Sequence, residues 1–154
     1  MASPQVPQTQ LSELYQRDFC QWAEKMAALL RTGDFAQLDL DNLIEEVEDL
    51  SGSQKRALLS NLRVLLMHLL KYQYQPDKRS PSWRSSILEH RLRLQELFEE
   101  SPSLKSFLAE NFDKAYQKAR RQAALETDLP IQIFPQVCLF SQMDVLHEDW
   151  LPEQ

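Results

Sequence analysis

The feature that most constrains this chain is its lack of glycine. Only two of its 154 residues are glycines, Gly33 and Gly52, where average usage of ~7% would give about eleven. Sandwiches and barrels need many turns with positive φ, and Rossmann and P-loop sites need clustered glycines. These folds are therefore excluded, and helices joined by short links are favoured.

The length and composition fit one globular domain. The chain is 43% hydrophobic and 26% charged, which is ordinary for a protein with a packed core. Residues 1–10 are polar and contain Pro4 and Pro7, so we expect a disordered or loosely docked arm there. Residues 11–154 then form a single helical domain.

Apolar residues recur at steps of three and four along most of the chain, which indicates amphipathic helices. We expect five main helices, over residues 11–31, from 39 or 41 to 50, 54–74, 83–100 and 102–126. Gly33 is expected to end the first helix. The second helix has an apolar stripe, and the third is expected to line the core with leucines; these are Leu40, Leu43, Ile44 and Val47, and Leu58, Leu62, Leu65, Leu66 and Leu69. Ser51-Gly52-Ser53 is expected to turn the chain so that the third helix runs antiparallel to the second. Ser101-Pro102 is interpreted as the start of the fifth.

The C-terminal stretch, residues 128–154, contains Pro130, Pro135 and Pro152 and has no long helical period. It is still apolar, so we expect it to pack along the bundle, with one short helix over residues 143–151. The fold predicted is thus all-α, a single-domain bundle of about five helices with a proline-containing C-terminal tail packed along it.

We expect neither a signal peptide nor a membrane helix. The N-terminus lacks the basic and apolar regions of a signal peptide, and no apolar run approaches the ~20 residues of a membrane helix. Cys20 and Cys138 form no CxxC motif and are interpreted as free thiols. We therefore expect a cytoplasmic protein with no membrane segment.

Charge is distributed unevenly. Residues 34–51 carry seven acids and no base, whereas residues 52–94 carry nine bases and two acids. The basic stretch could bind nucleic acid. The simpler interpretation is that the two stretches neutralise each other, and the formal net charge of −6 also opposes binding to phosphate.

Some polar residues fall among apolar helical positions. Arg91 lies on the same helix face as Ile87 and Leu94, and a buried guanidinium needs a carboxylate partner. We expect a polar seam between helices, built from four candidate residues: Glu45, Glu48, His68 and Arg91.

Three interpretations of this seam stay open. It is a buried ion pair that fixes helix register, a catalytic or ligand site, or a set of solvent-facing residues. In a catalytic site a carboxylate would act as base, the histidine as acid or base, and the arginine as an anion binder. Glu45 and Glu48 stand at i, i+3, but no Glu-x-x-His motif accompanies them, so we expect no metal and no cofactor.

The segment 71–84 mixes aromatic and basic residues. A single nucleic-acid strand could stack and be neutralised there. The simpler interpretation is that the aromatics anchor a loop while the charges are solvated. The candidate surface residues are Lys71, Tyr74, Lys78, Arg79 and Trp83.

A string of short motifs resembles a known bacterial family. It comprises Leu14-Tyr15-x-x-Asp18-Phe19-x-x-Trp22, Leu38-Asp39-x-Asp41-Asn42-Leu43-Ile44-Glu45-Glu46-Val47-Glu48, His68-Leu69-Leu70-Lys71, Tyr74-Gln75-Pro76, Ser82-Trp83, Ser101-Pro102-Ser103-Leu104, and Glu126-Thr127 to Phe134-Pro135 with Cys138. This order resembles the family called domain of unknown function twenty-nine, from about Leu14 to Trp150. The resemblance implies an all-helical single domain and no established activity, so it brings no catalytic residues. Tyr72, in place of a frequent tryptophan, and Ser51-Gly52 depart mildly from the family pattern.

No catalytic or cofactor motif is recognisable, so the leading hypothesis is a small helical protein-interaction or regulatory module. Its partner would be a protein, either another copy of the chain or a different one. One alternative is an enzyme that uses Glu45, Glu48, His68 and Arg91. A second, less favoured, is nucleic-acid binding through residues 71–84.

Overall fold

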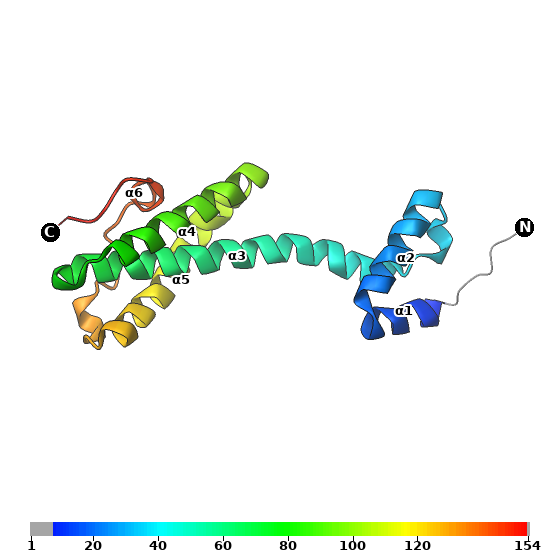
Figure 1. Cartoon of the computed structure of the whole chain (residues 1–154), viewed down its shortest axis with the longest axis horizontal. Coiled ribbons are helices and arrows are strands. Elements are labelled where there is room, and N and C mark those ends of the chain that lie inside the picture. The colour runs from blue at the N-terminus through cyan, green and yellow to red at the C-terminus, as the bar shows by residue number, and fades with distance from the viewer. Residues whose placement is uncertain (1–7, 154) are drawn as a thin grey trace, which may run out of the picture. The chain divides into compact units, whose positions relative to one another are not determined.

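The computed structural model describes residues 8–153, and this part of the chain is helical with no strand (Figure 1). The elements in chain order are α1 (Gln8–Arg17), α2 (Phe19–Thr32), η1 (Phe35–Gln37), α3 (Leu40–Tyr74), η2 (Pro76–Lys78), α4 (Pro81–Glu100), α5 (Leu104–Thr127), η3 (Ile131–Ile133) and α6 (Gln142–Leu146), where η marks a 3₁₀ helix. The all-α prediction is confirmed. Most of the arm expected over residues 1–10 lies outside the described residues, and α1 already begins at Gln8.

Contacts group the chain into two compact units, residues 1–52 and residues 53–154. The boundary falls within α3, which contributes residues to both units. That residues 11–154 behave as one domain stays a prediction, and an unfolding experiment that tests it is given in the Discussion.

In the first unit, the single helix expected over residues 11–31 is divided at Asp18. This residue leaves the helical conformation (φ −149°), and its side chain accepts a hydrogen bond from the backbone N–H of Gln21 at 3.0 Å. Aspartate satisfies an otherwise unpaired amide at the start of a helix, so Asp18 begins α2 where periodicity alone predicted continuation. Gly33 ends α2 with φ +77°, which confirms its predicted role.

The core of the first unit surrounds Trp22. This side chain is 2% exposed and packs with an apolar cluster, whose other buried members are Leu11, Leu14, Met26 and Leu38. Its indole Nε1 donates to Asp39 Oδ2 at 3.0 Å. Tyr15 adds a second polar link, because its hydroxyl donates to Glu46 Oε1 at 2.5 Å. Both bonds connect the first two helices to the beginning of α3.

Helix α3 continues through Ser51-Gly52-Ser53, so the turn expected there is wrong. Among the described residues Gly33 is the one glycine with positive φ, and Gly52 therefore keeps helical geometry. A glycine inside a helix costs only about 0.5–1 kcal/mol relative to alanine. Residues with high helix propensity on both sides of Gly52 outweigh this cost. The second and third predicted helices are one helix of 35 residues.

In the second unit, the C-terminal part of α3 packs with α4 and α5. The stripe predicted to face the core is confirmed, because all of its leucines are fully buried, namely Leu58, Leu62, Leu65, Leu66 and Leu69. Helix α4 begins at Pro81, where the Ser80 side chain accepts from the N–H of Trp83. Helix α5 begins at Leu104, because Ser101 ends α4 and Pro102 lies in the turn between the helices.

The tail packs along the second unit, as predicted. Phe134 and Val145 are fully buried in its core, and the Phe134 ring meets Tyr74 edge-on at 5.4 Å between centroids. The short tail helix spans only Gln142–Leu146 and begins at Ser141, whose side chain accepts from the N–H of Asp144.

Two further expectations bear on localisation. The cysteines are free, with Cys20 exposed and Cys138 half-buried. Within residues 8–153, every helix is too short or too polar to cross a membrane.

Candidate functional site

Arg91 is buried in the second unit, and it holds the C-terminal tail. Its side chain is 1% exposed, and its guanidinium donates to three backbone carbonyl oxygens, Nε to Val145 at 2.8 Å, Nη1 to Glu148 at 3.2 Å and Nη2 to Asp144 at 3.4 Å. Carbonyls at the end of a helix have no partner within that helix. Arg91 therefore supplies a donor to the Val145 carbonyl in the last turn of α6, and it shares the Asp144 carbonyl with the N–H of His147. Burial lowers the pKa of Arg91 to about 10, while the charge of Asp149 acts to raise it.

The burial predicted for Arg91 is thus confirmed, but its predicted carboxylate partner is wrong. Several backbone carbonyls, each with a partial negative charge, replace the carboxylate. Glu45 and Glu48 are exposed in the first unit, whereas His68 and Arg91 belong to the second. The seam depended on a turn at residues 51–53, and α3 has none.

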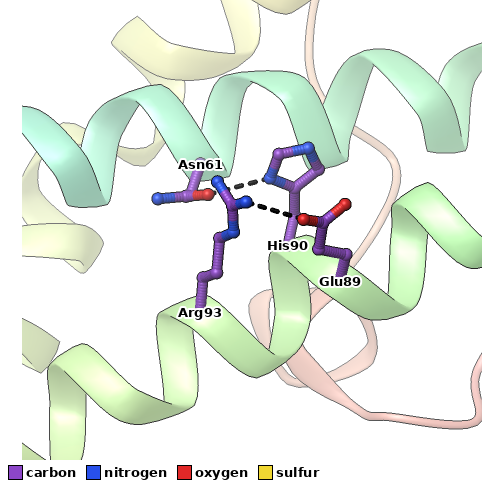
Figure 2. A network of polar contacts seen from close by, with 4 residues as sticks. All are labelled: Asn61, Glu89, His90 and Arg93. Atoms are coloured by element: carbon purple, nitrogen blue, oxygen red, sulfur yellow. Dashed lines mark hydrogen bonds and ion pairs between the residues drawn. The ribbon is translucent and has the colours of Figure 1, made fainter.

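His68 lies beside a second histidine, His90. The His90 Nδ1 donates to Asn61 Oδ1 at 2.8 Å and so connects α4 to α3, as Figure 2 shows. Next to it, Arg93 and Glu89 form an exposed ion pair at 2.6 Å (Figure 2). The Nδ1 atom of His68 is buried without a hydrogen-bond partner. Burial, with the charges of Lys71 and His90, lowers the pKa of His68 to about 4, and burial also lowers the pKa of His90.

These shifts predict a loss of stability in acid. The folded protein keeps His68 neutral, whereas the unfolded chain protonates it near the ordinary pKa of 6.5. The free energy of unfolding is therefore highest above pH 6.5 and decreases as the pH falls toward 4. Because solvent screens a half-buried ring, we expect this decrease in the free energy of unfolding to be about 1–2 kcal/mol. Urea unfolding at pH 7 and pH 4.5 should therefore show a smaller pH effect in His68→Gln than in the wild type. The exposed His147→Gln should behave like the wild type, and an unchanged pH effect in His68→Gln would contradict the assignment.

In segment 71–84, the bases lie against the protein's own aromatic rings. Lys71 Nζ lies 4.8 Å from the centroid of the Trp83 ring, and the Arg79 guanidinium lies 4.3 Å from that of Tyr72. Arg79 also donates to the Tyr72 carbonyl at 2.7 Å. Tyr74 packs on Phe134, and Lys78 is exposed in η2. This arrangement favours the simpler interpretation, in which the aromatics anchor the segment.

The first unit exposes an apolar stripe on α3. Four large side chains follow one another at helical spacing, and their exposed fractions are 56% for Leu40, 46% for Ile44, 59% for Val47 and 70% for Leu50. On the same helix, Leu43 faces the core of the first unit. Glu48 flanks the stripe, and Glu45 lies on the same flank; both are exposed. The sequence predicted the apolar character of Leu40, Ile44 and Val47 but not their exposure.

Arg120 is a structural residue that sequence reasoning missed. Its guanidinium donates to the carbonyls of Phe134 at 2.9 Å and Ile131 at 3.2 Å, and the Tyr116 hydroxyl donates to the carbonyl of Pro135. Arg120 stands between Tyr116 and Ala123 on the core side of α5, as Arg91 stands between apolar residues on α4. The same signal, a base within an apolar stripe, could have found it.

Over the described part of the chain, no group of three or more His, Cys, Asp and Glu side chains is placed to hold a metal ion. The exposed apolar stripe of α3 is a separate candidate functional surface, because its four large side chains face solvent.

In the comparison with protein families, the model of the Domain of unknown function DUF29 matches residues 14–151. It agrees with the family that the motifs resemble. Comparisons with curated proteins and with solved structures give no match.

Proposed function

We propose that this chain, which belongs to the DUF29 family of domains of unknown function, is a helical protein-interaction module. Its docking surface is the apolar stripe of α3, formed by Leu40, Ile44, Val47 and Leu50. The observation that carries the proposal is the exposure of all four side chains, from 46% to 70%.

The spacing of the stripe supports this role. Leu40, Ile44, Val47 and Leu50 stand at i, i+4, i+7 and i+10, and this period places them on one face of the helix. Amphipathic helices use such positions as anchors when they lie in a hydrophobic groove of a partner. Single exposed apolar residues are normal, but a contiguous row of them marks an interaction site.

The two alternatives have less support. An enzyme that uses Glu45, Glu48, His68 and Arg91 would need Arg91 free for an anionic substrate, and its donors are occupied by tail carbonyls. Nucleic-acid binding through residues 71–84 would need free aromatic rings, but Lys71 and Arg79 lie over Trp83 and Tyr72.

The test is affinity capture from a lysate of the source organism with three tagged proteins: the wild type, Val47→Asp and Leu125→Asp. Leu125 is 83% exposed on α5, so its replacement is a matched control outside the stripe. We expect one stoichiometric protein with the wild type and with Leu125→Asp. Val47→Asp should recover at most about a tenth of it, since a charge in an apolar interface is not solvated.

Thermal unfolding should be similar in all three proteins, because the replaced side chains are exposed. Equal recovery by Val47→Asp and the wild type, or no stoichiometric partner for any of them, would contradict the proposal.

A further inference from the structure

The second unit contains a basic groove between α3 and α5. Its volume is about 250 Å³, and its walls carry four bases, Arg56 and Arg63 from α3 and Lys114 and Lys118 from α5. Leu59 and Ala115 add apolar surface, and none of the lining residues is acidic. This set of side chains defines the α3–α5 groove.

The arrangement of charge in the groove favours an anionic occupant. Lys114 and Lys118 are separated by one helical turn, and like charges at that spacing destabilise a helix. Arg63 donates to Gln122 Oε1 at 2.5 Å, which orients the guanidinium but leaves its charge in place because the amide is neutral. An acidic ligand would offset the repulsion between these bases.

We propose that the α3–α5 groove binds the acidic segment of α3, residues 40–50, from a second copy of the chain. The inference rests on the proposed function and names the partner of the same apolar stripe. Residues 40–50 carry five acids and no base. The segment thus offers both features that the groove receives, apolar side chains for Leu59 and Ala115 and carboxylates for the bases Arg63, Lys114 and Lys118.

A second copy fits the groove better than a nucleic acid does. Phosphate backbones are recognised through charge, and they make no use of the apolar residues in the groove. The formal net charge of −6 repels a polyanion and a second copy alike at long range, so the apolar residues of the groove decide between them. The acidic segment brings its charge together with Leu40, Ile44, Val47 and Leu50.

The test is charge exchange in the full-length chain, followed by sedimentation velocity. Glu45→Lys/Glu48→Lys makes the segment basic, and Lys114→Glu/Lys118→Glu introduces acids into the groove. The wild type should self-associate at ~50 mM salt and dissociate as the salt rises to ~500 mM, because screening weakens exposed charge pairs.

Each double variant alone should associate at least ~10-fold more weakly, since like charges then face each other. A 1:1 mixture of the two should associate again, because each supplies the charge that complements the other. Two controls carry the same charge changes elsewhere on exposed side chains, Glu13→Lys/Glu24→Lys and Lys78→Glu/Lys105→Glu, and both should associate like the wild type.

A wild type that stays monomeric at low salt, or a mixture that does not associate, would overturn the inference. Binding of single-stranded RNA that is lost in Lys114→Glu/Lys118→Glu while self-association is unchanged would overturn it too. Capture of a different protein that depends on Val47, by a monomeric chain, would leave the proposed function standing and this inference refuted.

Discussion

Replacing Arg91 by methionine should lower the free energy of unfolding by about 1.5–3 kcal/mol, the range typical of losing hydrogen bonds made by a charged group. Methionine keeps much of the buried volume but donates no hydrogen bond. The buried Val145 carbonyl would lose its donor, and an unpaired buried acceptor costs about 1–3 kcal/mol. The Asp144 carbonyl would keep the N–H of His147. Urea denaturation followed by far-UV circular dichroism measures the change.

Arg93→Met is the matched control, because it removes the same side chain two residues further along α4. Arg93 is exposed and pairs only with Glu89 in an i, i+4 arrangement, so its loss should cost under ~1 kcal/mol. Hydrogen exchange adds a local measurement: Arg91→Met should lose protection in residues 141–148 before α5 does. Similar unfolding energies for the two variants would show that Arg91 does not hold the tail.

Replacing Trp22 by alanine should cost about 3–5 kcal/mol, as is typical for a large buried aromatic. The substitution leaves a cavity among Leu11, Leu14 and Met26 and removes the donor to Asp39. Asp39 is 8% exposed, so its carboxylate would keep only the Asn42 amide, at 2.8 Å. Phe35→Ala is the control in the same unit, where 64% exposure predicts a change within ~0.5 kcal/mol.

This variant also tests whether residues 11–154 are one domain. A single cooperative domain loses both units in one transition, so Trp22→Ala should shift one common transition seen by fluorescence and by circular dichroism. Separate transitions, with the first unit unfolding at lower urea, would contradict the single-domain prediction.

Much of the fold could be predicted because the apolar period is long and regular. The five leucines of α3 from Leu58 to Leu69 are buried as expected, and Gly33 ends α2 as expected. The errors concern where helices begin and end. Asp18 divides a helix that periodicity predicted as continuous, while Gly52 leaves continuous a helix that a Ser-Gly-Ser motif predicted to break. A helix cap or a glycine inside a helix changes the stability of that helix by only about 1 kcal/mol. Contacts with neighbouring residues therefore decide whether the helix breaks or continues.

The candidate site was harder to predict, because it depends on which elements meet. A base among apolar residues correctly indicated that Arg91 is buried. Its partner could not be read from charge, because backbone carbonyls occur at every residue and leave no pattern in a sequence. The stripe from Leu40 to Leu50 was recognised as apolar, but periodicity does not distinguish a helix face that packs within the chain from one that faces solvent.

Arg91 and Arg120 contact the tail through main-chain oxygen atoms. A backbone carbonyl is present whatever side chain the residue carries. The attachment therefore depends on where the backbone of the tail runs and not on the identity of its side chains. The exposed tail positions, such as Val137, Leu139 and Met143, are therefore free to diversify without loosening the attachment. A library randomised at these positions should keep the stability of the wild type, whereas variants at Arg91 should be less stable, and the tail is accordingly the place where this fold can accept new sequences.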